Sequence, residues 1–308
     1  MTPWLRWFRV RLLGTALSNA LVGYWLALER GHVWTEGTLL PLLVITTALY
    51  LFGMGHNDYC DRERDRTLYP DRPLPSGAIR AKTARGALIS LLLVAATTLA
   101  LAPFDPLAPG VVVAAILVAI VSYNAFCKDN KLLGPLAMGS ARAGLVLLGA
   151  AVVNPHALLT VAVPAACLLG FVGLITSYSM LEERGSHWQR RLHHLVAAGW
   201  IIVAALAVVR EVGPVPVAAR ILWTGTAAWC FLYAGRPIRR GKAPLTTLRL
   251  LLALLLLDAA ILVSYDQAIA AWIPGIVFLV VWRPWFDKRS RSPKTSPITP
   301  SKPLGEAP

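Results

Sequence analysis

The sequence predicts an all-α integral membrane protein, and three observations carry that prediction. First, 56% of the 308 residues are hydrophobic and the mean hydropathy is +0.58, which is too apolar for a soluble chain of this length. Second, the chain contains several apolar stretches of about the 17 to 25 residues that a helix needs to cross a bilayer. Third, these stretches are continuously apolar, whereas the strands of a membrane β-barrel alternate. Helices must therefore satisfy the backbone within the lipid.

Nine apolar stretches are predicted to span the membrane. In chain order they are 12–28, 38–54, 86–104, 110–127, 132–153, 157–181, 192–209, 214–234 and 243–264. A tenth stretch, 268–282, is short, so the sequence leaves nine and ten spans open. The last segment, 290–308, is rich in Pro, Ser, Thr and Lys and predicts a disordered tail. The expected organisation is one transmembrane domain over 1–289 and a tail over 290–308.

Basic residues are distributed unevenly between the two sides of these spans. If the amino terminus faces inward, 26 of the 30 Lys and Arg residues fall on the inner side. The exceptions are Arg30, Arg210 and Arg220 on the outer side and Arg142 within the fifth span. This pattern follows the positive-inside rule, so the net charge of +14 reflects topology and attraction to acidic lipid headgroups, not nucleic-acid binding. We expect a bacterial inner-membrane protein with both termini in the cytoplasm.

A polar run from His56 to Asp65 follows directly on the second span. If the helix of that span continues, Asn57, Asp61 and Asp65 lie on one face, four residues apart, with Asp58 beside them. Carboxylates stacked in this way repel one another, and a hard divalent cation such as Mg²⁺ would relieve the repulsion. The alternative is a solvated helix end whose acids pair with neighbouring arginines, Arg62, Arg64 and Arg66.

A proline-rich segment follows the acidic run. Three prolines and a glycine between Pro70 and Gly77 exclude a helix and predict a structured turn. The N-D-x-x-D-x-x-x-D core that begins at Asn57, followed by Arg72-Pro73-Leu74-Pro75-Ser76-Gly77, resembles the first signature of the UbiA superfamily of intramembrane prenyltransferases. The resemblance implies a bundle of nine core transmembrane helices, with a short tenth left open, around a cavity that opens laterally to lipid.

The loop between the fourth and fifth spans runs from Tyr123 to Lys131. Taken alone, it is typical of a positive-inside loop with an interfacial tyrosine. A Tyr followed five residues later by Lys also resembles the superfamily element that holds the substrate diphosphate, which implies that Lys128 binds diphosphate and Tyr123 supports it. Lys131 and Arg142 are weaker candidates. Arg142 lies inside an apolar span, where an ionisable group is a functional hypothesis by default; the alternative is an arginine that reaches back to the inner surface or bonds carbonyls across helices.

The end of the sixth span departs from the superfamily pattern. Members carry a second motif of closely spaced aspartates there, whereas this chain has Glu182 and Glu183 and no aspartate. Either Glu182 aligns with the first acid and Ser186 with its partner, or the pair is Ser179 and Glu183. Glutamate can still bind Mg²⁺, and His187 is a further candidate ligand. The alternative is that these are solvated charges on a loop.

The remaining spans carry fewer signals. We expect Asp258 in the ninth span to hydrogen-bond across helices, and His193 and His194 to face the lipid headgroups. Small residues around Gly139 predict close helix packing in the fifth span.

The resemblance implies Mg²⁺-dependent transfer of a prenyl group from an allylic prenyl diphosphate to an electron-rich acceptor, aromatic or lipid-like, within the membrane. The expected partners are thus a prenyl diphosphate, a small hydrophobic acceptor and membrane lipid. The alternative is a catalytically weakened member that binds or carries a prenyl compound or lipid. The residues implied are Asp61, Asp65 and Lys128 in catalysis, Lys128, Tyr123, Arg72 and Arg142 at the diphosphate, and Asn57, Asp58, Asp61, Asp65, Glu182 and Glu183 at the metal.

Overall fold

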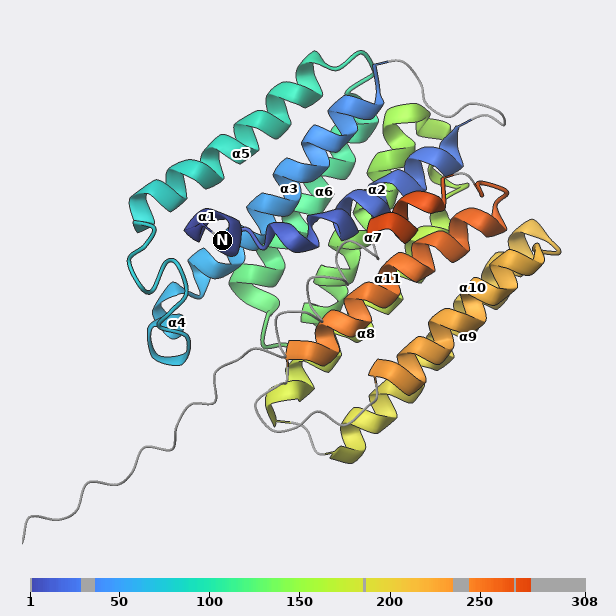
Figure 1. Cartoon of the computed structure of the whole chain (residues 1–308). Coiled ribbons are helices and arrows are strands. Elements are labelled where there is room, and N and C mark those ends of the chain that lie inside the picture. Colours follow the sequence, from blue (N-terminus) through green and yellow to red (C-terminus); the bar gives the residue numbers. More distant parts are fainter. Residues whose placement is uncertain (1, 29–36, 185–186, 235–243, 269, 278–308) are drawn as a thin grey trace, which may run out of the picture.

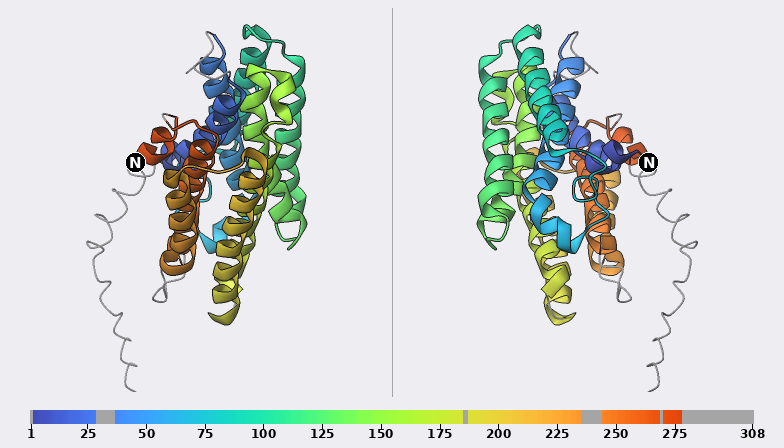
Figure 2. Two further views of the ribbon diagram at one scale, coloured as in Figure 1. Left: turned by 90° about the vertical axis from the view of Figure 1, so that its right-hand side faces the viewer. Right: turned by 90° about the vertical axis from the view of Figure 1, so that its left-hand side faces the viewer.

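Helices form the whole of the regular structure in the described part of this computed structural model (Figure 1). The described residues are 2–28, 37–184, 187–234, 244–268 and 270–277. The expected tail over 290–308 and the later part of the predicted tenth span lie outside them. The long helices run side by side, as the two side views show (Figure 2).

Each of the nine predicted spans coincides with a helix or with a helix extended by a π-helical turn. The elements are α1 (Pro3–Trp7), a 3-10 turn (Val10–Leu12), α2 (Leu13–Ala27), α3 (Leu39–Cys60), α4 (Arg62–Leu68), α5 (Ala81–Leu101), α6 (Leu107–Ser122), a π-helical turn (Tyr123–Cys127), α7 (Leu133–Val153), a 3-10 turn (Pro155–Leu158), α8 (Ala162–Arg184), α9 (His187–Val212), α10 (Val217–Ala228), a second π-helical turn (Trp229–Ala234) and α11 (Pro244–Ser264). Within the described ranges, six helices are long and apolar enough to cross a membrane: those over Leu39–Cys60, Ala81–Leu101, Leu107–Cys127, Leu133–Val153, Ala162–Met180 and Arg191–Val212. The predicted all-α membrane fold is confirmed.

Helix α7 lies at the centre of the bundle and packs against α2, α6 and α8. Glycines permit these close approaches, because a Cβ at Gly149 would lie 1.9 Å from the carbonyl oxygen of Ala20, and one at Gly23 would lie 1.8 Å from that of Val146. A Cβ at Gly139 would likewise lie 2.4 Å from the carbonyl oxygen of Leu169 in α8. The predicted close packing of the fifth span is therefore confirmed, and small residues at the interface explain it.

The outer helices expose apolar side chains where a membrane would contact them. Helix α5 is at one edge of the bundle and α10 at the other (Figure 1). Large exposed hydrophobic residues include Ile89 and Leu93 on α5, Val118 on α6, and Ile202 and Leu206 on α9. Exposed apolar surface on this scale is expected of a lipid-facing bundle.

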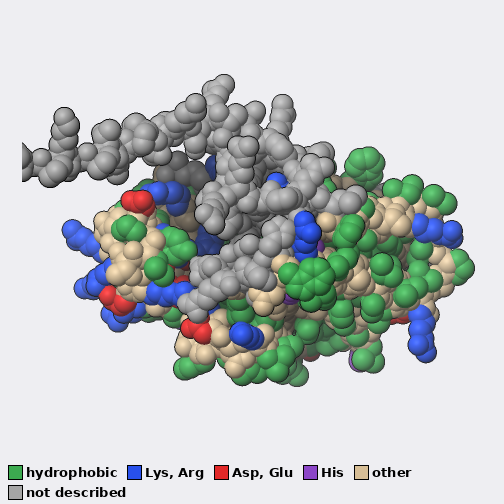
Figure 3. Space-filling model, turned by 90° about the horizontal axis from the view of Figure 1, so that it is seen from below, with side chains coloured by type: hydrophobic (Ala, Val, Ile, Leu, Met, Phe, Trp, Pro, Cys, Tyr) green, Lys and Arg blue, Asp and Glu red, His purple; other side chains and the backbone are tan. Residues whose placement is uncertain are grey.

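The polar segments after α3 and α6 lie at one end of the bundle, near α4 (Figure 1). Seen from that end, Lys, Arg, Asp and Glu side chains cluster on one part of the surface, with hydrophobic side chains on its flanks (Figure 3). The candidate site lies at this end.

Two expectations about the later spans have different outcomes. Asp258 does bond across helices, to Ser18 and Asn19 of α2. The expectation that His194 faces the headgroups is wrong, since its side chain is buried and its ring packs 4.8 Å from that of Tyr178, centroid to centroid. The helical register turns this residue inward, although its neighbours along the chain are basic.

Candidate active site

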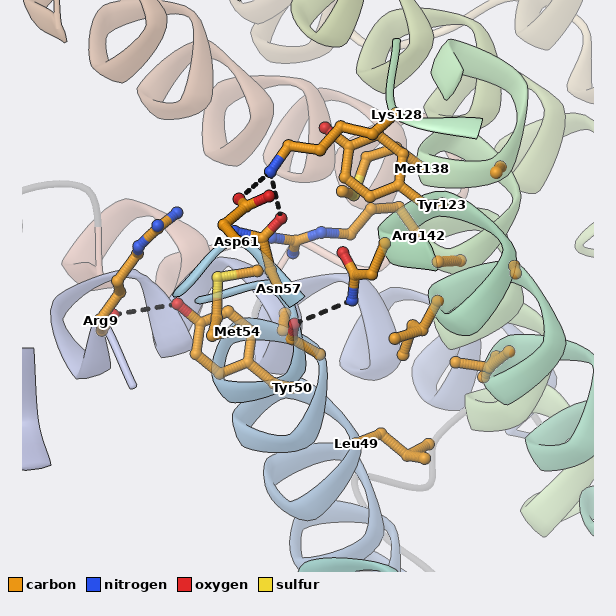
Figure 4. Close-up of a pocket in the computed structure, with 18 of the residues that line it drawn as sticks. Arg9, Leu49, Tyr50, Met54, Asn57, Asp61, Tyr123, Lys128, Met138 and Arg142 are labelled. Carbon is orange, nitrogen blue, oxygen red and sulfur yellow. Dashed lines mark hydrogen bonds and ion pairs between the residues drawn. The ribbon is translucent and has the colours of Figure 1, made fainter. Parts of the chain in front are cut away.

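A cavity of about 300 Å³ opens among α2, α3, α6 and α7 at the polar end of the bundle (Figure 4). Its walls are apolar and come mainly from α3, α6 and α7: Leu49, Met54, Ile116, Ile120, Met138 and Leu145. Its polar lining consists of Arg9, Tyr50, Asn57, Asp61, Arg64, Asp65, Tyr69, Arg72, Tyr123, Asn124, Lys128 and Arg142. An apolar pocket with convergent polar groups is the usual form of a small-molecule site.

Asn57, Asp61 and Asp65, called the acidic row below, keep their four-residue helical spacing through a break in the helix. Helix α3 ends at Cys60 and α4 begins at Arg62, with Asp61 at the junction at a ψ of −4°. The backbone N–H of Asp61 still donates to the carbonyl of Asn57 at 3.0 Å, and that of Asp65 to the carbonyl of Asp61 at 2.8 Å. Because the four-residue spacing survives, all three side chains line the cavity as the sequence predicted.

Lys128 reaches this row from the loop after α6. The π-helical turn before it is anchored to α3, because the Asn124 side chain donates to the carbonyl of Gly53 at 3.3 Å. The Lys128 ammonium then donates to Asn57 Oδ1 at 3.1 Å and to Asp61 Oδ2, as Figure 4 shows. Tyr123, from the same turn, also lines the cavity. The loop after α6 and the acidic row, about 70 residues apart in sequence, thus form one site.

The proline-rich turn contributes Arg72. The turn folds back on itself through a hydrogen bond from the Ile79 N–H to the carbonyl of Pro73 at 2.9 Å. Arg72 donates to Asp65 Oδ2 at 2.5 Å, and its guanidinium lies 4.2 Å from the centroid of the Tyr69 ring. The ring and the carboxylate together hold the arginine at the cavity edge.

Asp58, one residue from Asn57, faces a different partner. Its side chain is buried and pairs with Arg9 at 2.7 Å, and it is absent from the lining of the cavity. The Arg9 backbone is held by the Tyr50 hydroxyl, which donates to the Arg9 carbonyl at 2.9 Å. Sequence reasoning placed Asp58 among the metal ligands and missed Arg9, which does line the cavity. No local signal links Arg9 to a residue 49 positions later.

Arg142 lies within α7 and also lines the cavity. Its guanidinium donates to Asn19 Oδ1 of α2 at 3.2 Å. The bond across helices is expected under the alternative, and the position in the cavity lining is expected under the functional hypothesis, so a functional role of Arg142 stays a prediction.

The cavity carries a formal excess of positive charge suited to an anion. Its lining includes five cationic side chains, Arg9, Arg64, Arg72, Lys128 and Arg142, against two carboxylates, Asp61 and Asp65. The excess is three charges. In an apolar pocket this excess favours a polyanion such as a diphosphate.

The donor set also fits Mg²⁺. Asn57 Oδ1 and Asp61 Oδ2 converge on one cationic atom, the Lys128 ammonium nitrogen, so two oxygen donors already face a common cation position. Amide and carboxylate oxygens are ligands that Mg²⁺ prefers. Within the described residues, His, Cys, Asp and Glu side chains form no group of three that could hold a metal ion. The two aspartates of the row pair with separate cations, Asp61 with Lys128 and Asp65 with Arg72.

The second acidic motif cannot be placed with the first. Glu182 and Glu183 belong to the last turn of α8, but their side chains lie outside the described part of the structure, as does that of His187. Their predicted role at a metal therefore stays a prediction.

Residues 16–186 match the model of the UbiA prenyltransferase family, which is more than half of the chain. A curated relative, digeranylgeranylglyceryl phosphate synthase of Methanoregula boonei, is 34% identical over 150 residues. That match covers 47% of this chain and 52% of the relative, so the chain spans about half the length of the relative it matches.

Solved structures share the fold at low sequence identity. A digeranylgeranylglyceryl phosphate synthase structure matches with a TM-score of 0.60 at 16% identity, over 86% of this chain and 98% of that one. A UbiA homologue from Archaeoglobus fulgidus bound to DMAPP and Mg²⁺ matches with a TM-score of 0.60 at 12% identity, over 90% and 99%. These likenesses establish the fold, and the family match establishes the relationship. The chain is an integral membrane protein that belongs to the UbiA prenyltransferase family.

Proposed function

We propose that this protein transfers a prenyl group from an allylic prenyl diphosphate to an electron-rich acceptor inside the membrane, in a Mg²⁺-dependent reaction. One observation carries the proposal: the row Asn57, Asp61 and Asp65 meets Lys128 and Arg72 at the polar end of an apolar cavity. The site thus combines oxygen ligands for a metal ion with basic side chains for a diphosphate. Both lie beside an apolar space suited to an isoprenoid.

The metal would be held by Asn57, Asp61 and Asp65, with Glu182 or Glu183 as further ligands. Asp58 would act on the metal site indirectly, through its neighbour Asn57. Mg²⁺ bound there would neutralise the negative charge of the diphosphate. Lys128 and Arg72 bind the diphosphate oxygens, and they do so by exchanging their present carboxylate partners for the substrate. Tyr123 and Arg142 complete the polar lining around it.

The chemistry requires that the bond between the allylic carbon and the diphosphate oxygen break, with its electron pair leaving on the diphosphate. Lys128 and Arg72 stabilise the negative charge that develops there. The allylic cation is then attacked by an electron-rich atom of the acceptor, which forms the new bond and loses its proton. The apolar walls, such as Ile116, Met138 and Leu145, exclude water that would otherwise capture the cation.

Two observations support the proposed class of acceptor. The curated relative is named a digeranylgeranylglyceryl phosphate synthase, and the cavity is apolar with a cationic lining, which suits a lipid-like or aromatic acceptor. The positive-inside pattern supports a site that faces the cytoplasm.

The test is turnover in reconstituted vesicles. Labelled geranyl diphosphate is supplied with Mg²⁺ and a panel of aromatic and glyceryl phosphate acceptors, and release of diphosphate and formation of prenylated product are measured. Asp61→Asn should abolish transfer, whereas Glu63→Gln, which changes an exposed acid of the same run that bonds Arg66 outside the cavity, should keep it. Equal turnover in both variants would remove the acidic row from the mechanism.

The second candidate is a prenyl or lipid carrier. The observation that favours it is that both aspartates of the row, Asp61 and Asp65, are already paired with a basic side chain, together with the lack of aspartate in the second motif. The same vesicles distinguish it: a carrier would bind geranyl diphosphate but release no diphosphate with any acceptor.

A further inference from the structure

A buried polar network lies behind the cavity, between α2, α7 and α11. Asp258 of α11 is 0% exposed, as is Asn19 of α2. Asp258 Oδ2 accepts from the Ser18 hydroxyl at 2.5 Å. The Asn19 amide nitrogen donates to both oxygens of the same carboxylate, at 3.1 and 2.9 Å. Asp258 itself is absent from the cavity lining.

The carboxylate determines which way the Asn19 amide faces. An ionised carboxylate only accepts hydrogen bonds, so the NH₂ group of Asn19 must point toward Asp258. The amide oxygen then points the other way, where it accepts from Arg142 at 3.2 Å. The hydrogen bonds among these three residues therefore all run the same way: the Arg142 guanidinium at the cavity donates to Asn19, and Asn19 donates to the Asp258 carboxylate within the bundle.

This arrangement compensates the charge of Arg142 without occupying most of its guanidinium N–H donors. A carboxylate in direct contact commonly takes two of the five guanidinium N–H donors. Here the counter-charge stands one side chain away, and Asn19 is the hydrogen-bond partner of Arg142 among the described residues. A buried charge is costly unless it is compensated. Asp258 compensates Arg142 while most of the guanidinium stays available to a ligand.

The cations at the polar end of the cavity are different. Lys128 and Arg72 each contact a carboxylate directly and must release it to bind an anion. Within the described part of the chain Arg142 pairs with no carboxylate that it would have to release, and α2 and α11 hold its orientation from behind.

We infer that Arg142 binds an anionic oxygen of a ligand in the cavity, and that Asp258 is a positioning residue that acts on Arg142 through Asn19. The inference rests on the proposed function, because the oxygen belongs either to the prenyl diphosphate or to an anionic acceptor. The two sources share one chemistry, and binding measurements separate them.

The experiment measures binding to the full chain in nanodiscs, with geranyl diphosphate plus Mg²⁺ and, separately, lysophosphatidic acid as a glyceryl phosphate probe. Arg142→Gln should weaken binding of at least one probe about 10-fold or more, the value of one charge-assisted hydrogen bond. The affected probe identifies the source of the oxygen. Unchanged affinity for both probes would overturn the inference. A wild-type protein that does not bind geranyl diphosphate would contradict the proposed function, and Arg142 would then be judged on lysophosphatidic acid alone.

The positioning role has its own readout. Asp258→Asn, and independently Asn19→Ala, should weaken the same probe, and the double variant Arg142→Gln with Asp258→Asn should lose no more affinity than Arg142→Gln alone. Ser264→Ala is the matched control, because it removes a buried hydrogen bond between α11 and Trp223 away from the cavity. It should lower the unfolding temperature and leave both affinities unchanged. Additive losses in the double variant, or an effect of Asp258→Asn on unfolding temperature alone, would refute the positioning role.

Discussion

Lys128→Gln should change the affinities for diphosphate and for metal in opposite directions. The ammonium of Lys128 contacts both Asn57 Oδ1 and Asp61 Oδ2, which are two of the donors expected at the metal. In the substrate-free protein the lysine therefore competes with a divalent cation for these oxygens. In the complex it binds the diphosphate. Glutamine is one bond shorter than lysine, stays polar and removes the charge.

The magnitudes follow from the burial of the pair. The side chains of Lys128 and Asp61 are 26% and 14% exposed, so the ion pair is largely but not fully desolvated. Releasing Asp61 from such a pair costs about 1–2 kcal/mol, so the variant should bind a divalent cation about 5 to 30 times more tightly without substrate. Loss of a charge-assisted bond to diphosphate costs about 1.5–3 kcal/mol, so geranyl diphosphate should bind roughly 10 to 150 times more weakly.

Both affinities can be measured on the same preparation. Mn²⁺ serves as a paramagnetic probe for the metal, and labelled geranyl diphosphate at saturating Mg²⁺ reports the substrate. Lys131→Gln is the control, because Lys131 lies in the same loop, is exposed and does not line the cavity. Two affinities that fall together in Lys128→Gln would mean that the lysine supports the metal site instead of competing with it.

Three further changes test the packing and the remaining ion pairs. Gly149→Ala places a Cβ 1.9 Å from a backbone oxygen of α2 and should lower the unfolding temperature in detergent by several degrees. Gly225→Ala is the control, because nothing lies within 4 Å of its Cβ, and it should leave the unfolding temperature unchanged. Equal unfolding temperatures of the two variants would contradict the close α2–α7 packing. Arg9→Gln leaves the buried Asp58 unpaired and should destabilise the fold by about 1–2 kcal/mol. This is less than the value for a fully buried pair, because the arginine is 38% exposed. Unfolding followed by calorimetry or fluorescence measures the loss, and no loss would mean that Asp58 does not need its partner. Arg72→Gln should weaken geranyl diphosphate binding about 10-fold, and unaltered binding would remove this arginine from the diphosphate site. Because Arg72 pairs with the buried Asp65, this variant should also lose about 1–2 kcal/mol of stability, as Arg9→Gln does, so binding is measured at a temperature at which the variant is folded.

The fold could be predicted from the sequence to within a few residues at most helix ends. Continuous apolar stretches identify spans because lipid leaves the backbone no other partner, and α3, α7 and α11 follow from that fact alone. The sequence did not predict the short π-helical turn that ends α6. That turn depends on a tertiary contact, the bond from Asn124 to the Gly53 carbonyl, and it is what brings Lys128 to the acidic row.

The candidate site was predictable where spacing along one helix determines it. Asn57, Asp61 and Asp65 line one cavity because residues four apart share a helix face. Arg9 was not predictable, since its contact with Asp58 joins segments 49 residues apart. The network behind Arg142 was not predictable for the same reason, because Asp258 follows Asn19 by 239 positions.

Helical geometry divides the acidic run into two functions that its sequence does not separate. Asp58 follows Asn57 by one residue and is therefore turned about 100° around the helix from the cavity row. There it is buried against Arg9, whose carbonyl the Tyr50 hydroxyl also binds, so the segment before α2 is fixed to α3 by two contacts. Because Arg9 lines the cavity, Asp58 holds a cation at the site without facing the ligand. Exchanging Asp58 for Asn should therefore loosen the amino-terminal segment and weaken anion binding indirectly, whereas the same exchange at Asp61 should act on the metal directly.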